Sequence, residues 1–411
     1  MLSSSQNSVL PLKDKTNAKE TISNFKWKSI GSSLEPLSMD SLKSPRIPSV
    51  QTSRSHKPVA SSSTRTTPRN IRCQTARNSE RKSIEMPFTI NPDLTKCSLK
   101  ENGIVKAYAA CTNQGLVRNY NEDRVSIILN IMKPPNRANE NWPRCSFFGV
   151  YDGHGGSACA DFLRDNLHQF VIRDPNFPFN PKEAIKAGFQ AAERTFLEFA
   201  KSQTPIDRSG SCAIVIVIVG EICYAANVGD SRAIMSGEKG SKIYPLSKDH
   251  KPYEEKEYER IISKGGRVYQ STVQGQENQQ IAGPYRVFPG RLSVSRTFGD
   301  IEGKHEDLGG NSEVLISSPE IKAFKVHAGY DFIVLASDGI FDKLTNKEVI
   351  QCVWSSVYEG KAQNCHRQCG NAVENVMKTA LIRRTLDNIT VVMIALESFI
   401  TQVEGIYSRD S

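Results

Sequence analysis

The sequence has no apolar run approaching the ~20 residues that a transmembrane helix requires. It opens Met1-Leu-Ser-Ser-Ser, without the apolar centre of a secretory signal peptide. Its second residue is not Gly, so N-myristoylation is not indicated. We therefore expect a protein without a transmembrane segment, in the cytoplasm, the nucleus or both.

Cysteine pairs with the spacing of metal ligands are also scarce. The ten cysteines are scattered, and Cys365-His-Arg-Gln-Cys369 is the one candidate pair. A zinc site needs further ligands, and no second pair accompanies this one. We interpret the segment as a helix face with two buried thiols, with a metal pair as the alternative. Free thiols in a reducing compartment are the expected state of the cysteines.

The main part of the chain has no excess of either charge. The net charge of +9 comes from residues 1–90, which hold 15 Lys and Arg against 6 Asp and Glu, while the other 321 residues hold 38 of each. Composition therefore gives no support to nucleic-acid binding by the core. Residues 1–90 are rich in Ser, Thr, Pro and basic residues, so we expect a disordered tail. The predicted domain is 91–398, followed by a short tail, 399–411.

Strands and helices are predicted from the apolar pattern between residues 96 and 398. The run Cys212 to Val219 is the most apolar, and its Ile and Val content predicts a buried strand. Residues 269–290 contain many Gln, Gly and Pro and are predicted to form a surface loop, and little structure is signalled beyond Ser398. Hairpin-connected strands with grouped helices indicate an α+β fold with antiparallel sheets. We expect strands at 105–111, 125–130, 146–150, 212–219, 222–227, 233–236, 331–336 and 389–396, and helices at 157–167, 181–202, 254–264, 346–358 and 368–384.

Acidic residues recur where an apolar strand meets a turn. Asp152 lies in Val150-Tyr-Asp-Gly-His-Gly-Gly156, directly after a predicted strand. Turn chemistry explains any one such residue. Several carboxylates brought together would repel one another unless cations neutralised them. Oxygen ligands favour Mg²⁺ or Mn²⁺ over Zn²⁺, and two such ions can deliver an activated water to phosphorus. The other acidic residues in comparable positions are Glu122, Asp123, Asp230, Asp338 and Asp387.

Three neighbouring residues could serve such a site. Arg118 offers a planar fork to a phosphate dianion, although a surface arginine fits its spacing equally well. Gly153 allows a sharp turn that brings a backbone carbonyl close to a ligand. His154 is near enough to Asp152 to donate a proton to a leaving group, with a structural histidine as the alternative.

Eight segments in this order resemble the protein phosphatase 2C family of metal-dependent Ser/Thr phosphatases. The resemblance covers roughly residues 105–397 and implies a four-layer α-β-β-α sandwich with two central antiparallel sheets. The matching segments are Arg118-Asn-Tyr-Asn-Glu-Asp123, Val150-Tyr-Asp-Gly-His-Gly-Gly156, Ser209-Gly-Ser-Cys-Ala213, Asn227-Val-Gly-Asp-Ser-Arg-Ala233, Asp249-His-Lys-Pro252, Leu292-Ser-Val-Ser-Arg-Thr-Phe-Gly-Asp300, Ala336-Ser-Asp-Gly339 and Asp387-Asn388.

The resemblance also implies a role for each candidate residue. Asp152 would bridge two metal ions, and the Gly153 carbonyl would bind one of them. Asp338 and Asp387 would complete the first site. Glu122 and Asp123 would hold the second, largely through water, and Asp230 would belong to a weaker third site. Arg118 would bind the substrate phosphate, and His154 would act as the general acid.

The leading hypothesis is therefore a metal-dependent protein serine/threonine phosphatase. A metal-bridging hydroxide would attack the phosphorus of phosphoserine or phosphothreonine directly, without a phosphoenzyme. No Cys is followed six positions later by Arg, which excludes a cysteine-based phosphatase. The alternative is a non-catalytic phosphatase-like scaffold, which predicts lost metal ligands, and none is lost. We expect phosphoprotein substrates, no nucleic-acid partner and a monomer.

Overall fold

A computed structural model describes residues 95–274, 280–360, 362 and 364–408. The predicted disordered tail, 1–90, lies outside the described residues. None of the described helices is both long and apolar enough to cross a membrane.

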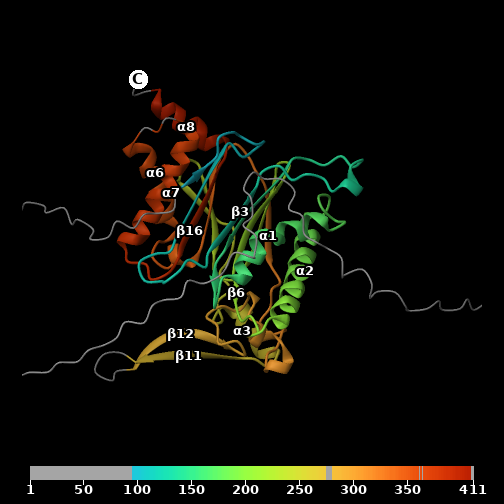
Figure 1. The fold of residues 1–411 in the computed structure, drawn as a ribbon. Coiled ribbons are helices and arrows are strands. Elements are labelled where there is room, and N and C mark those ends of the chain that lie inside the picture. Colours follow the sequence, from blue (N-terminus) through green and yellow to red (C-terminus); the bar gives the residue numbers. More distant parts are fainter. Residues whose placement is uncertain (1–94, 275–279, 361, 363, 409–411) are drawn as a thin grey trace, which may run out of the picture. The chain divides into compact units, whose positions relative to one another are not determined.

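Two antiparallel sheets form the centre of the described domain (Figure 1). The first sheet has the order β1-β2-β16-β15-β9-β10. Its strands are β1 Lys96–Cys97, β2 Ala107–Asn113, β16 Ile389–Ala395, β15 Tyr330–Ala336, β9 Arg232–Gly237 and β10 Lys242–Pro245. The second has the order β14-β8-β7-β4-β3, with β14 Glu320–Lys325, β8 Ile222–Val228, β7 Ala213–Val219, β4 Cys145–Tyr151 and β3 Arg124–Ile128.

Strand β7 shows why the central strands are apolar throughout. Val215 and Val217 point to the cluster shared with the helices, whereas Ile214 and Ile216 point to the cluster between the sheets. Because successive side chains of a strand alternate between its faces, a strand with both faces covered has no polar positions. The prediction of a buried strand at 212–219 is confirmed, apart from its first residue.

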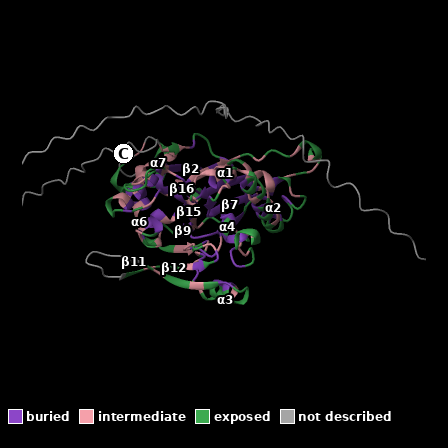
Figure 2. Ribbon diagram, turned by 60° about the horizontal axis from the view of Figure 1, so that its bottom comes forward, coloured by how far each residue is buried: buried purple, intermediate pink, exposed green. Residues whose placement is uncertain are grey.

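Helices cover the outer face of each sheet (Figure 1). Helices α1 Ala158–Arg173 and α2 Pro181–Ser202 pack on the second sheet. Helices α6 Asn346–Glu359, α7 Cys365–Ile382 and α8 Glu397–Tyr407 pack on the first. The strands between the helical layers are buried (Figure 2). The predicted α+β fold, a four-layer α-β-β-α sandwich, is confirmed.

Smaller elements gather near one end of the sandwich, where β6 is seen in Figure 1. A short sheet with the order β13-β6-β5 consists of β13 Phe298–Gly299, β6 Gly210–Ser211 and β5 Gly153–His154. The remaining elements are α3 Glu255–Ser263, β11 Arg267–Gln274, β12 Gln280–Phe288, α4 Ile301–Lys304, α5 Asp338–Phe341 and the 3-10 turns Pro135–Arg137 and Glu306–Leu308.

The prediction of a surface loop at 269–290 is wrong, because β11 and β12 form an antiparallel hairpin. Near the base of the hairpin, Val287 joins a small core with Ile261, Val314 and Leu315. Much of the hairpin is exposed (Figure 2). A two-stranded ribbon with little buried surface lacks the regular apolar alternation from which strands are predicted.

Two further expectations need correction. Helix α8 continues well past Ser398, where little structure was expected, because Phe399 and Val403 anchor it on the first sheet. Ile400, Ile406 and Tyr407 also pack against that core, so a helical spacing of apolar residues is present in the sequence, and the expectation of little structure was wrong. In α7, Cys369 is fully buried but Cys365 only partly, so the predicted pair of buried thiols is half right, and neither forms a disulfide.

Candidate metal centre and active site

The predicted acidic residues lie at one end of the two sheets. Strand β4 runs parallel to β8 because both pair antiparallel with β7, so Asp152 and Asp230 follow strands that end at the same edge. In the first sheet β15 pairs antiparallel with β16, which brings Asp338, after β15, to the side of Asp387, before β16. The strand pairing therefore brings together, at one end of the sheets, turns that are distant in the sequence.

Three of these carboxylates converge. Asp152, Asp230 and Asp338 each offer an oxygen, and these oxygens lie within 4.8 Å of one another. Burial raises the pKa of Asp152 well above its ordinary value, and the charge of Asp338 raises it further. Burial likewise raises the pKa of Asp338, to which the charge of Asp230 adds. Ionised carboxylates this close need a cation, and an all-oxygen set suits Mg²⁺ or Mn²⁺. The residues present therefore fit the expected divalent ions.

Asp123 and Glu122 lie outside that group of three and are held by hydrogen bonds. One oxygen of Asp123 accepts hydrogen bonds from Ser337 Oγ at 2.8 Å and Thr390 Oγ1 at 2.7 Å. Its other oxygen, Oδ1, is buried without a hydrogen-bond partner among the described residues. Burial raises the pKa of Asp123 to about 6. Glu122 accepts a hydrogen bond from the Gly156 N–H at 2.5 Å. The unpaired buried oxygen of Asp123 suits a ligand of a divalent ion, either directly or through water.

Gly153 is required by a close approach and not by an unusual backbone angle. A Cβ at this position would lie 2.5 Å from the backbone oxygen of Glu122. The positive φ angles of the segment belong instead to Gly155, at 67°, and Gly156, at 125°. Gly153 thus lets the turn after β4 lie against the turn before β3, whereas Gly155 and Gly156 lie beside Arg208 and Ser209.

Arg118 also reaches the site. Its Nη2 lies 2.5 Å from Asp387 Oδ2, with 46% of the arginine side chain and 31% of the aspartate side chain exposed. Burial alone would lower the pKa of Arg118, but the charges of Asp387 and Asp152 raise it. The structure therefore favours a site arginine over an unattached surface one.

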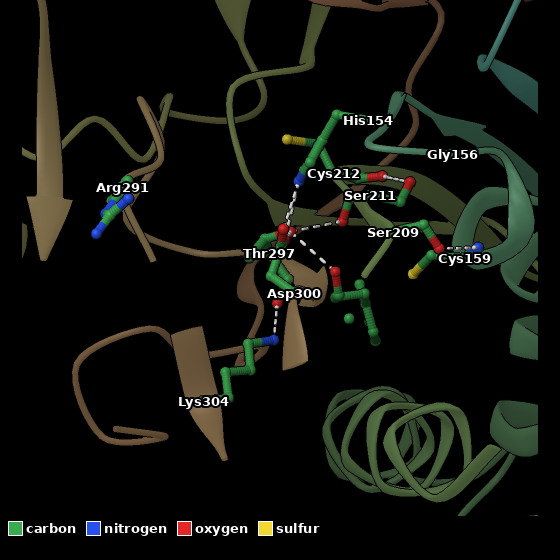
Figure 3. Close-up of polar contacts among 12 residues, drawn as sticks. His154, Gly156, Cys159, Ser209, Ser211, Cys212, Arg291, Thr297, Asp300 and Lys304 are labelled. Atoms are coloured by element: carbon green, nitrogen blue, oxygen red, sulfur yellow. Dashed lines mark hydrogen bonds and ion pairs between the residues drawn. The ribbon is translucent and has the colours of Figure 1, made fainter. Parts of the chain in front are cut away.

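His154 is joined to a residue whose role the sequence did not reveal. Its Nε2 lies 2.9 Å from both carboxylate oxygens of Asp300 (Figure 3). Burial alone would lower the pKa of His154, but the carboxylate of Asp300 raises it above the ordinary value. Asp300 ends the segment Leu292 to Asp300, yet Gly-Asp is a common turn pair and carries no sign of a distant histidine.

Lys251 is a second site residue that sequence reasoning missed. Its ammonium group contacts Asp230 Oδ2. Although burial lowers the pKa of Lys251, the charge of Asp230 raises it. Asp342, one turn after Asp338, also has a pKa raised by burial and then by its acidic neighbours. The sequence marked Lys251 only as part of Asp249-His-Lys-Pro252.

Several known proteins are similar to this chain in sequence. The probable protein phosphatase 2C 45 of Oryza sativa subsp. japonica is 34% identical over 247 residues, which is 60% of this chain and 75% of the relative. The probable protein phosphatase 2C 59 of Arabidopsis thaliana is 35% identical over 64% of this chain and 73% of the relative. Other relatives are longer, and the chain spans 54% of protein phosphatase 2C homolog 2 of Hypocrea jecorina.

Solved structures share the fold. The serine-threonine phosphatase 2C of Toxoplasma gondii superposes with a TM-score of 0.55 at 19% identity, over 74% of this chain and 99% of that chain. A sex-determining protein of C. elegans superposes with a TM-score of 0.59 at 21% identity, over 75% of this chain and 68% of that chain. The family profile described as protein phosphatase 2C matches residues 108–389. The chain therefore belongs to the protein phosphatase 2C family of metal-dependent protein serine/threonine phosphatases.

Proposed function

We propose that this protein hydrolyses phosphoserine and phosphothreonine in proteins at the carboxylate cluster. The observation that carries the proposal is the convergence of Asp152, Asp230 and Asp338, from three separate turns, within 4.8 Å. A cluster of like charges at this spacing destabilises a fold unless it binds cations, so binding is the reason for its presence. A non-catalytic scaffold is not favoured, since every predicted ligand position keeps its residue.

The proposed cofactor is Mg²⁺ or Mn²⁺, as two ions with a weaker third. Asp152 and the Gly153 carbonyl, with Asp338 and Asp387, would hold the first ion. Asp152, Glu122 and Asp123 would hold the second, and Asp230 belongs with the third. When bound, such ions activate water for attack on phosphorus and neutralise charge on the phosphate. Two oxygen-rich sites around one shared carboxylate suit small hard cations.

The chain's own residues supply binding and proton transfer. Arg118 would turn its guanidinium from Asp387 to the substrate phosphate, whose planar pairs of oxygens match its fork. His154 would give a proton to the serine or threonine oxygen as the bond from phosphorus to that oxygen breaks. The products are the free hydroxyl side chain and inorganic phosphate, with the water oxygen on the phosphate.

Other expectations stay predictions. Phosphoproteins are the proposed substrates, and the intracellular location and the monomeric state rest on the sequence alone. The predicted domain limits, 91–398, likewise stay a proposal.

Phosphate release tests the proposed function. The full chain is incubated with a phosphothreonine peptide and Mn²⁺, with and without a chelator. We expect turnover that chelation abolishes. Asp152→Asn removes charge but little volume, so it should fold and lose activity, whereas the matched change Asp307→Asn, at a side chain 76% exposed, should leave the rate unchanged. No phosphate release by the wild-type chain under either condition would favour the scaffold.

A further inference from the structure

His154 is oriented by one contact from a distant part of the chain. Both oxygens of Asp300 face its Nε2 at 2.9 Å, so Nε2 carries a hydrogen and donates it (Figure 3). Within the part of the chain that the structure describes, the other ring nitrogen, Nδ1, has no hydrogen-bond partner. The ring is thereby fixed with Nδ1 as the nitrogen that remains to exchange a proton with a substrate.

The short sheet β13-β6-β5 builds this pair. His154 on β5 is opposite Gly210 on β6, and Gly210 is opposite Gly299 on β13, directly before Asp300. A Cβ at Gly210 would lie 2.0 Å from Asp300 Oδ2 and 2.5 Å from His154 Nε2. The pair therefore lies directly over Gly210, and the absence of a side chain there is a condition for the contact.

Asp300 is itself held in place on several sides. Its φ of 51° and ψ of 51° are left-handed, a conformation that Asp and Asn adopt more readily than most residues. Its N–H donates to the Ser209 carbonyl at 3.0 Å, and its Oδ2 accepts from Thr297 Oγ1 at 2.8 Å. These contacts fix both the backbone and the carboxylate of Asp300.

A buried ion pair anchors the same turn to α2. Lys304 and Glu193 are 3% and 9% exposed, and their charged groups are in contact. Lys304 Nζ also donates to the Thr297 carbonyl at 2.6 Å, and Glu193 Oε2 accepts from the Gly299 N–H at 3.0 Å. A buried ion pair contributes little net stability but imposes a definite geometry. Here that geometry is imposed on Thr297, which bonds the Asp300 carboxylate, and on Gly299, which directly precedes Asp300.

We infer that Asp300 is the positioning residue of His154: it sets the ring so that Nδ1 faces the leaving oxygen, and it touches no substrate itself. The inference rests on the proposed function, in which His154 donates the proton. Loss of Asp300 should therefore lower kcat only for substrates whose leaving group must be protonated.

Two substrates separate these cases. A serine alkoxide needs protonation to leave, whereas the nitrophenolate of p-nitrophenyl phosphate is a stable anion and does not. Asparagine keeps the volume of aspartate and tolerates the left-handed backbone, but its amide can present a donor to Nε2. With Asp300→Asn we expect kcat on a phosphoserine peptide to fall ~100-fold, the lower end of the usual contribution of a general acid, with KM nearly unchanged. On p-nitrophenyl phosphate kcat should fall less than about threefold.

A double variant tests whether Asp300 acts through His154. His154→Asn should show the same preference between substrates, and His154→Asn with Asp300→Asn should be no slower than His154→Asn alone, because residues that act as a unit are not additive. Thr297→Val, which removes the hydroxyl bonded to Asp300 with little change of shape, should give a smaller loss, about fivefold, in the same direction. Asp307→Asn, on the same loop but bonded to Lys201, is the matched control and should change nothing.

Two outcomes overturn the inference. Equal losses of kcat on both substrates would show that Asp300 is only a structural residue. If the two single losses of kcat multiplied in the double variant, Asp300 would act independently of His154. If the proposed function itself is wrong, the result is different, since the wild-type chain would then release phosphate from neither substrate.

Discussion

Arg118 and Asp387 are 269 residues apart and form an ion pair with 2.5 Å between Nη2 and Oδ2. The arginine thus neutralises one carboxylate of the proposed metal centre, while 46% of its own side chain stays exposed. Metal ions and Arg118 are expected to compete for Asp387, and a bound phosphate then replaces Asp387 as the partner of the arginine.

Replacing Arg118 should separate substrate binding from metal binding. In Arg118→Ala we expect KM for a phosphopeptide to rise at least about tenfold, the effect of losing a charge-assisted pair of hydrogen bonds. Mn²⁺ affinity, measured by calorimetry, should increase because Asp387 loses its competitor. Arg383→Ala, which breaks a 2.6 Å ion pair with Glu348 of similar exposure, is the control. An unchanged KM would remove Arg118 from the phosphate site.

The metal-free protein should become more stable as the pH falls from 7.5 to 5.5. The pKa of Asp123 is raised by burial to about 6, and those of Asp152 and Asp338 are also raised. A carboxyl with a raised folded pKa favours the folded state when protonated, and this contribution is lost as the pH rises through that pKa. Thermal unfolding with a chelator should therefore give a higher Tm at pH 5.5 than at 7.5, and Mn²⁺ at pH 7.5 should raise it. A metal-free Tm that falls on this acidification would contradict the account.

Removing one charge from the cluster should stabilise the metal-free fold. Asp338→Asn removes the charge repulsion of residue 338 with Asp230 and Asp152. We therefore expect the free energy of unfolding of the metal-free protein to rise by on the order of 1–3 kcal/mol at pH 7.5. The same variant should lose most of the stabilisation by Mn²⁺. Urea unfolding with and without Mn²⁺ measures both effects, with Asp307→Asn as the reference. A destabilised metal-free variant that still responds to Mn²⁺ would argue against the proposed ligand.

The buried pair of Lys304 and Glu193 should be costly to break. Lys304→Met leaves Glu193 buried without its partner, and we expect a loss of about 3–5 kcal/mol in the free energy of unfolding. Combining it with Glu193→Gln should recover part of that loss, because no unpaired charge then remains. A loss below about 1 kcal/mol in the single variant would mean that water reaches Glu193.

Much of the fold followed from the apolar pattern because the central strands have both faces covered, as β7 illustrates. The hairpin β11–β12 was missed since it buries few side chains, whereas helix α8 was missed although its apolar residues follow the helical period. The metal-binding candidates were recognisable because carboxylates at strand ends repeat one local pattern. Asp300 and Lys251 were not, because their roles depend on partners 146 and 21 residues away, and no local pattern records such a pairing.

The most direct test of the central claim is a crystal structure of the full chain soaked with Mn²⁺, with the ions located by anomalous scattering. The account predicts two ions that share Asp152, with Asp338 and Asp387 on one of them and Arg118 released from Asp387. Manganese bound elsewhere, or a cluster that stays empty while Arg118 remains on Asp387, would contradict it.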